Sequence, residues 1–303
     1  MILLLMIKGN VYLLLASLLL AGSAQSQIKF QTVAPGETQA GLTTVHTPHL
    51  VVTPAAENNR HQLLVMIPGT GGSATGLRTF DSTFAAMGYY VVSLDYVNNV
   101  ITTVCSKSED SACFDHFRQE IMFGTDVSDK VVVDSANSLV NRLTKLLLYQ
   151  AANDKAWAGF VRKGKVRWDK VIAAGHSQGA GHAAYFGKQF PLRGVLMFSG
   201  PQDYLQNFNA PAHWQRERSR TPVKRYYAFL HNADPFNYQY QVADVSVINH
   251  QAVTDTTMVQ PGQAVHSTRS ILVTDIDRKD RHGSTLLTDF VGVWKYMISN
   301  ATK

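Results

Sequence analysis

The sequence lacks several features that would indicate other classes of protein. Its 303 residues contain no internal repeat and no low-complexity tract. The net charge is +6, but the basic residues are scattered apart from two short clusters at 216–220 and 278–281. A nucleic-acid-binding protein usually carries a concentrated basic stripe, so we expect no nucleic-acid partner. With 45% hydrophobic and 17% charged residues, the composition is that of a globular protein long enough for one full core.

The N-terminus has the pattern of a secretory signal. Lys8 is followed by the apolar run VYLLLASLLL at 11–20 and then by small residues. This run is short for a membrane span, although an uncleaved anchor remains the alternative. The stretch LAGS at 20–23 has serine where a lipoprotein would need cysteine. We expect residues 1–26 to be a signal peptide cleaved after Ala24 or Ser26, and the protein to be secreted or periplasmic without stable membrane insertion.

Cysteine is scarce as well. Cys105 and Cys113 are the only two, no Cys-x-x-Cys pair occurs, and only His116 lies close to them as a further metal ligand. In an exported protein a close pair favours a disulfide. We therefore predict a Cys105–Cys113 disulfide and expect neither a metal nor a cofactor.

After the signal, short apolar runs alternate with helical stretches. Apolar spacing of three to four residues predicts an amphipathic helix over 128–152, with Ser128 as its N-cap. Continuously apolar strands alternating with helices imply a mostly parallel sheet covered on both faces, with ligands beyond the carboxyl ends of the strands. The predicted strands are 49–54, 62–69, 89–96, 169–177, 194–200, 225–231 and 270–275, and the other predicted helices are 80–87, 178–190 and 284–299.

The string Gly175-His176-Ser177-Gln178-Gly179 ends the strand 169–177 and begins the helix 178–190. In that context a serine can sit on a sharp strand-to-helix turn with its hydroxyl exposed at the sheet edge. Side chains at 175 and 179 would collide across so tight a turn, which explains the glycines. We interpret Ser177 as a nucleophile and His176 as a packing residue. The alternative is an ordinary Gly-rich turn.

This elbow and the order of the elements resemble the α/β-hydrolase superfamily over about residues 48 to 300. The turn IPGTGGS at 67–73 resembles the superfamily's His-Gly-x-x-Gly turn, with Pro68 in place of the histidine. The resemblance implies that Thr70 N–H and Gln178 N–H form an oxyanion hole. The rival interpretation of this turn, a phosphate-binding loop, lacks the Gly-Lys-Ser/Thr that would follow.

The resemblance also implies an acid and a base, in the chain order Ser, acid, His. Asp234, in AFLHNADPFN at 228–237, matches the acid position, and Asp203 is the alternative. His282, in DRKDRHGST at 277–285, matches the base position. His266 and His250 are the alternative bases.

These residues predict a serine hydrolase that works through an acyl-enzyme, with a small-molecule or polymeric carboxylic ester as substrate. A serine peptidase or amidase on the same fold and an inactive binding protein are the alternatives. We predict a single domain over 27–303 with insertions at 97–127, 201–223 and 240–268. Phe114, Phe117 and Trp214, which lie in the first two insertions, are candidate walls or rims of the substrate pocket.

Overall fold

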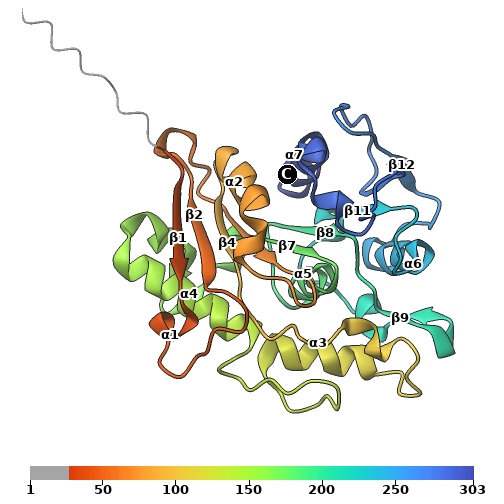
Figure 1. Ribbon diagram of the computed structural model, residues 1–303, viewed down its shortest axis with the longest axis horizontal. Coiled ribbons are helices and arrows are strands. Elements are labelled where there is room, and N and C mark those ends of the chain that lie inside the picture. Colours follow the sequence, from red (N-terminus) through yellow and green to blue (C-terminus); the bar gives the residue numbers. More distant parts are fainter. Residues whose placement is uncertain (1–26) are drawn as a thin grey trace, which may run out of the picture.

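The computed structural model describes residues 27–303, and the predicted signal peptide at 1–26 lies outside them (Figure 1). A nine-stranded sheet runs in the order β1-β2-β4-β3-β7-β8-β11-β13-β12. Its strands are β1 Lys29–Val33, β2 His49–Thr53, β3 Leu63–Ile67, β4 Tyr90–Ser93, β7 Val171–His176, β8 Gly194–Phe198, β11 Tyr226–His231, β12 Thr256–Met258 and β13 Ile271–Thr274. Two small hairpins pair β5 Val161–Arg162 with β6 Lys165–Val166, and β9 Tyr204–Leu205 with β10 Ala210–Pro211.

Only β2 runs against the other strands of this sheet, since it pairs antiparallel with both β1 and β4 while every remaining pair is parallel. This is the strand order of the α/β-hydrolase fold, so the predicted fold class is confirmed. The helices are α1 Pro35–Thr38, α2 Arg78–Ala86, α3 Cys113–Phe123, α4 Leu139–Asn153, α5 Gln178–Gln189, α6 Tyr238–Asn249 and α7 Val291–Ala301.

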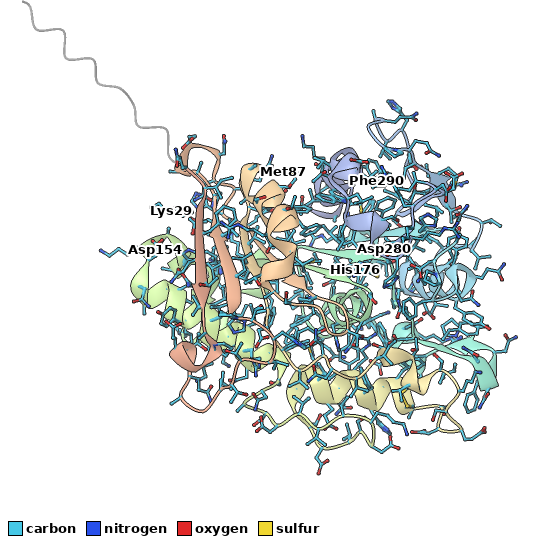
Figure 2. All side chains as sticks on the ribbon, in the orientation of Figure 1. Lys29, Met87, Asp154, His176, Asp280 and Phe290 are labelled. Atoms are coloured by element: carbon cyan, nitrogen blue, oxygen red, sulfur yellow. A yellow bond between two sulfur atoms is a disulfide. The ribbon has the colours of Figure 1, made fainter. Side chains whose placement is uncertain are left out.

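Alternate residues along the strands enter two separate cores. Val65 and Val92 pack with α3, α4, α5 and α6, whereas Leu64 and Val91 pack on the opposite face with α2 and α7. Side chains fill the space between the sheet and these helix layers (Figure 2). Because both faces are covered, the loops at the carboxyl ends of the parallel strands are left to form a site. Within residues 27–303, no helix combines the length and the apolar character that crossing a membrane requires.

The predicted helix over 128–152 is wrong in its first half. Helix α4 begins only after Ser138, whose hydroxyl oxygen accepts a backbone N–H of the first turn at 3.3 Å. The buried Glu120 carboxylate holds the preceding segment in an irregular conformation, because it accepts the N–H of Ser128 at 2.7 Å. A side-chain-to-backbone hydrogen bond of this kind competes with helix formation and leaves no trace in local periodicity.

Three other expectations change. Residues 240–268, predicted as a polar insertion, contain most of α6 and all of β12. The closing helix begins at Val291 rather than at 284, after two 3₁₀ turns. Phe114, Phe117 and Trp214 are buried in the core, with at most 1% of each side chain exposed, so they form no pocket wall or rim.

Candidate active site

Ser177 occupies the sharp turn between β7 and α5. Its backbone has φ 59° and ψ −122°, a combination that side-chain-bearing residues rarely adopt. The turn is held because Ser177 N–H donates to Phe198 O on the neighbouring strand β8 at 2.8 Å. Local strain of this kind is characteristic of a nucleophile elbow, which lifts the hydroxyl to the edge of the sheet.

The two glycines of the elbow make a close approach possible. A Cβ atom at Gly175 would lie 2.0 Å from the carbonyl oxygen of Gly179. A Cβ atom at Gly179 would lie 2.0 Å from Ile67 O, so the second glycine makes room for β3 rather than for the turn itself. Both contacts are with backbone atoms, which cannot move aside as a flexible side chain could.

A cavity of about 500 Å³ opens in front of the serine, and we call it the Ser177 cavity. Its walls include Thr70 and Leu77 from the loop after β3, together with Ile101, Phe236 and His282. The serine hydroxyl also accepts a hydrogen bond from Gln202 Nε2 at 3.3 Å. Ser177 and His282 therefore face one cavity, although no hydrogen bond joins their side chains.

The turn after β3 lies beside the first residue of α5. Thr70 Oγ1 donates to Gln178 Oε1 at 2.5 Å and so ties the two segments together. Asn98 holds the turn in place with hydrogen bonds. Its side-chain Nδ2 donates to Gly69 O at 2.7 Å, and its backbone carbonyl oxygen accepts Gly71 N–H at 3.0 Å. Within residues 27–303, the N–H groups of Thr70 and Gln178 donate to no protein acceptor. They are therefore free to bind an oxyanion.

Asp234 and His282 come together from the loops that follow β11 and β13. Asp234 Oδ2 lies 2.7 Å from His282 Nδ1, and its other oxygen accepts Phe236 N–H at 2.8 Å. Burial tends to raise the pKa of Asp234, but the hydrogen bond and positive charge of His282 outweigh burial and lower it. An ionised Asp234 fixes the tautomer in which Nδ1 carries the proton and Nε2 is a free base. That Nε2 atom is buried and has no hydrogen-bond partner in the described part of the chain.

The alternative acid and bases lie elsewhere. Asp203 forms a buried bidentate ion pair with Arg118 at 2.6 and 2.8 Å and also accepts Trp214 Nε1–H at 2.9 Å. Both carboxylate oxygens of Asp203 accept hydrogen bonds from Arg118 or Trp214, and neither donor is a histidine. His266 and His250 are exposed and line no part of the Ser177 cavity.

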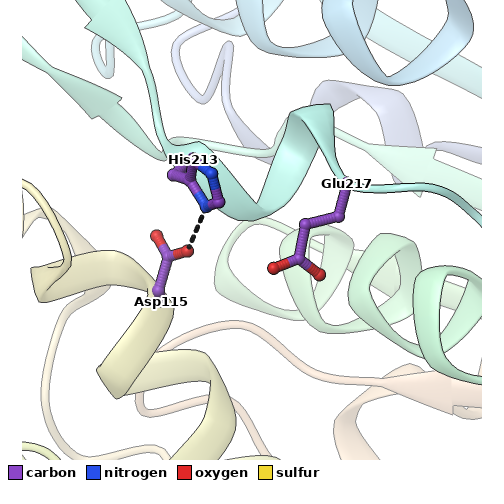
Figure 3. A group of neighbouring side chains, drawn as sticks. All are labelled: Asp115, His213 and Glu217. Carbon is purple, nitrogen blue, oxygen red and sulfur yellow. Dashed lines mark ion pairs between the residues drawn. The ribbon is translucent and has the colours of Figure 1, made fainter.

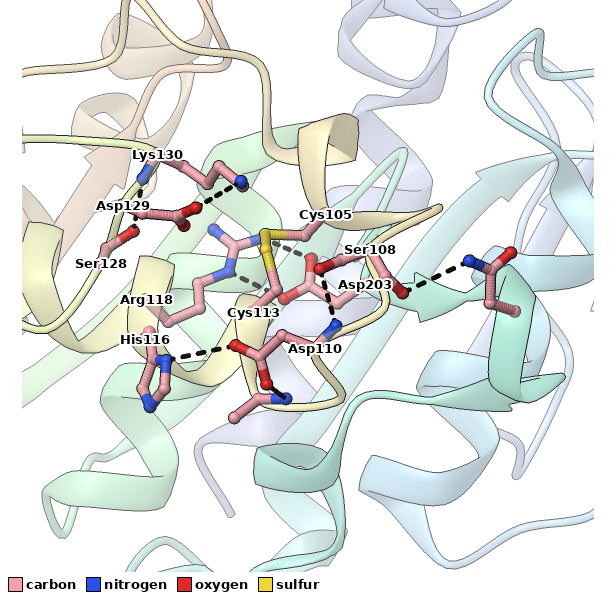
Figure 4. Close-up of a disulfide and its surroundings, with 12 residues drawn as sticks. Cys105, Ser108, Asp110, Cys113, His116, Arg118, Ser128, Asp129, Lys130 and Asp203 are labelled. Atoms are coloured by element: carbon pink, nitrogen blue, oxygen red, sulfur yellow. Dashed lines mark hydrogen bonds and ion pairs between the residues drawn. A yellow bond between two sulfur atoms is a disulfide. The ribbon is translucent and has the colours of Figure 1, made fainter.

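Figure 4 shows the ion pair of Arg118 with Asp203 close to the disulfide, and Arg118 also links this pair to the elbow. Its third nitrogen donates to Gln178 O at 2.8 Å, inside the first turn of α5. The helix that carries Arg118 begins at Cys113, which forms the predicted disulfide with Cys105. The disulfide is thus confirmed, and it anchors the helix whose arginine holds the first turn of α5.

His176 does more than pack. Its Nε2 donates to the carbonyl oxygen of His282 at 3.1 Å, and Ser199 Oγ donates to the same oxygen at 2.6 Å. Burial, with a smaller contribution from the nearby His282, lowers the pKa of His176 to about 4, so its ring is neutral at pH 7. His176 therefore positions the backbone of His282.

One side-chain group in the described residues has the spacing of a metal site. Asp115, His213 and Glu217 bring one ligand atom each to within 4.8 Å of one another (Figure 3). His213 and Glu217 are exposed, and His213 pairs with Asp115 at 3.4 Å. None of the three lines the Ser177 cavity, so this group takes no part in the site.

Asn98, Ser199 and Gln202 were not singled out from the sequence. The sequence does carry a hint of two of these residues, because Asn98 follows the strand predicted at 89–96 and Gln202 follows the strand predicted at 194–200. Both lie where the parallel-strand rule places ligand-binding groups. Polar residues are common in such loops, and only the contacts separate these from their neighbours.

No protein-family model and no curated protein matches the chain. Among solved structures, it is similar to a candidate dienelactone hydrolase from Klebsiella pneumoniae, at 12% identity and TM-score 0.49, over 91% of this chain and 99% of that chain. It is also similar to a lidless α/β serine hydrolase from Xanthomonas campestris, at 12% identity and TM-score 0.45, over 90% and 94% of the two chains. A third similar structure is an α/β hydrolase from a Medee basin deep-sea metagenome library, at 11% identity and TM-score 0.45, over 90% and 99%. The fold assignment rests on the strand order, and the site on the contacts described above.

Proposed function

We propose that this chain is a secreted serine hydrolase that cleaves carboxylic esters with Ser177, His282 and Asp234. The observation that carries the proposal is the Asp234–His282 hydrogen bond of 2.7 Å in a cavity shared with the strained Ser177. The free Nε2 of His282 is the base that a serine needs, because a serine hydroxyl is a weak nucleophile on its own.

In the first half-reaction, Ser177 Oγ attacks the ester carbonyl while His282 Nε2 takes the hydroxyl proton. The carbonyl oxygen becomes negative and is stabilised by the N–H groups of Thr70 and Gln178, aided by the N-terminal end of α5. Asp234 stabilises the imidazolium that forms. The bond to the alcohol oxygen then breaks, the alcohol leaves with the proton from His282, and an acyl-Ser177 remains.

In the second half-reaction, water replaces the alcohol. His282 accepts a proton from the water as its oxygen attacks the acyl carbon, and the same oxyanion site stabilises the new intermediate. Collapse of this intermediate returns the proton to Ser177 and releases the acid. The net change is ester plus water to acid plus alcohol, with no oxidant and no further reactant.

A fluorophosphonate probe tests the nucleophile, because it phosphonylates only activated serines. The wild type should be labelled and should hydrolyse 4-nitrophenyl acetate faster than 4-nitroacetanilide. Ser177→Ala should lose both labelling and turnover, while Ser82→Ala, which changes a serine on α2, should keep both. Labelling of Ser177→Ala at the wild-type rate contradicts the proposal, and a preference for the anilide indicates an amidase instead.

A further inference from the structure

A second cavity lies beside the Ser177 cavity. It has a volume of about 530 Å³, and we call it the tyrosine cavity after Tyr204 and Tyr240, which line it. Phe236 lines both cavities, and Gln202 lines the tyrosine cavity while donating to Ser177 Oγ at 3.3 Å. A substrate held at Ser177 can therefore extend into this space.

The position of His282 decides which half of an ester would enter the tyrosine cavity. The departing alcohol takes its proton from His282, so the alcohol must lie on the side of that ring. Phe236 packs against His282 with ring centroids 4.6 Å apart, and beyond Phe236 lies the tyrosine cavity. The acyl group would then lie in the Ser177 cavity, against the walls that Leu77 and Ile101 form.

The lining of the tyrosine cavity combines aromatic rings with polar groups. Tyr204 and Tyr240 stack face to face, with centroids 4.1 Å apart and planes 5° from parallel. Gln206, Lys107 and Asn237 also line the cavity, and all three residues are exposed. Within residues 27–303, no hydrogen bond joins the Gln206 side-chain amide, Lys107 Nζ or Asn237 Nδ2 to another protein group, whereas Asn237 Oδ1 accepts two backbone N–H groups of α6. No carboxylate is among the residues that line the cavity.

Hydrogen bonds hold the backbone of one wall of this cavity in place. Gln206 N–H donates to Ser106 O at 2.7 Å, and Asn207 Nδ2 donates to Lys107 O at 3.0 Å. The disulfide of Cys105, which directly precedes Ser106, ties the same segment to the start of α3. The backbone that carries Gln206 and Lys107 is therefore held in place, which lowers the entropic cost of ordering this wall when a ligand binds.

We propose that the tyrosine cavity binds a sugar ring, so that the substrates are carbohydrates esterified with a small acyl group. This inference rests on the proposed function. An alkyl chain would remove water from Gln206, Lys107 and Asn237 without replacing its hydrogen bonds, which is costly. A hydroxylated ring replaces those bonds, while its C–H faces pack against the tyrosine pair.

The test compares two acetates that share the acyl group and the shape of the alcohol. These are methyl 6-O-acetyl-β-D-glucopyranoside and cyclohexylmethyl acetate, which differ in the hydroxyl groups and oxygens of the sugar. We expect kcat/KM to be at least about tenfold higher for the sugar ester, the worth of one or two hydrogen bonds, and mainly through a lower KM.

Variants then locate the preference. Tyr240→Ala and Gln206→Ala should each lower the ratio of the two kcat/KM values by about fivefold or more. Tyr149→Ala, which changes a half-buried tyrosine on α4 outside both cavities, should leave the ratio unchanged. Both rates come from one preparation, so any unfolded fraction cancels in the ratio.

Equal or faster turnover of cyclohexylmethyl acetate by the wild type overturns this proposal, and so does a ratio that neither variant changes. A higher kcat/KM for an acetylated serine peptide than for the sugar ester overturns it in favour of a peptide ligand. In each of these outcomes Ser177-dependent hydrolysis persists, so the proposed function stands. Failure of the proposed function looks different, because then no acetate is hydrolysed in a Ser177-dependent way.

Discussion

His282 is held at both its side chain and its backbone. Asp234 binds the ring through Nδ1, while His176 and Ser199 both donate to the main-chain oxygen. A base that must reach a hydroxyl within a few tenths of an ångström benefits from both restraints, since a misplacement of about 1 Å can cost a hundredfold in rate. His176, next to the proposed nucleophile, thus acts through the backbone of the proposed base.

At this scale the choice between histidines is directly testable. His282→Ala should lower kcat for 4-nitrophenyl acetate by several orders of magnitude, because His282 is the ring that Asp234 binds at the Ser177 cavity. His266→Ala removes an exposed ring from another loop and should leave kcat within about twofold. Steady-state kinetics of both variants measures this, and the opposite result would assign the base to His266.

The resemblance to α/β-hydrolases favours Asp234 over Asp203, although both residues follow strands. The structure separates them by their partners, since Arg118 occupies Asp203 and His282 contacts Asp234. Position along the chain places a carboxylate at the correct edge of the sheet. Which carboxylate contacts His282 depends on how the loop after β13, which carries the histidine, packs against the loops that carry the two aspartates.

Among the elements, α3 and the loop at its start connect the disulfide to the site. Local periodicity did not reveal α3, and it misplaced the start of α4 by ten residues, from Ser128 to Ser138. The second error has a physical source, because Glu120 on α3 holds the segment between the two helices by accepting three of its backbone N–H groups. Pattern-based prediction works where an element's own spacing dominates, as it does for the buried strands.

The predicted signal peptide and the disulfide can both be tested by measuring the intact mass of the exported protein. Protein recovered from the periplasm or medium of an expressing bacterium should lack the residues before the cleavage point after Ala24 or Ser26. Alkylation without reduction should add no mass, because Cys105 and Cys113 are paired. Full-length mass or alkylated thiols would contradict the export proposal.

The disulfide should also stabilise the fold. In the double variant Cys105→Ser/Cys113→Ser, the free energy of unfolding in denaturant should fall by about 2–3 kcal/mol.

In the molecule as a whole, the sheet separates two cores, and the one under α2 and α7 contains a buried carboxyl group. Asp81 is fully buried; one of its oxygens accepts Ser93 Oγ–H at 2.7 Å, and the other has no partner within residues 27–303. Burial raises the pKa of Asp81 to about 8, although the Ser93 hydrogen bond acts in the opposite direction. The folded protein therefore keeps this group protonated at neutral pH.

This group makes stability depend on pH. A carboxyl whose folded pKa is raised contributes its full stability below its unfolded pKa and loses it as pH rises through the folded pKa. Asp81→Asn should therefore gain stability relative to the wild type as pH rises from 5 to 8, by roughly 1 kcal/mol per unit, and level off above. Urea unfolding of both proteins at pH 5, 7 and 9 measures the difference. A difference that stays constant with pH would show that Asp81 does not titrate in this range.

The sequence by itself determined the seven inner strands of the sheet, the elbow and the pairing of the cysteines, but not the edge strands β1 and β12. Apolar strands, small residues around Ser177 and two close cysteines are local features, and local features are what sequence patterns record. Tertiary structure alone decided that Asp234 rather than Asp203 contacts His282, that His176 binds the backbone of His282, and that a second cavity adjoins the first. Each of these features depends on contacts between segments that follow different strands. Because the carboxyl ends of parallel strands converge at one edge, residues far apart in the chain become neighbours only once the whole sheet is formed.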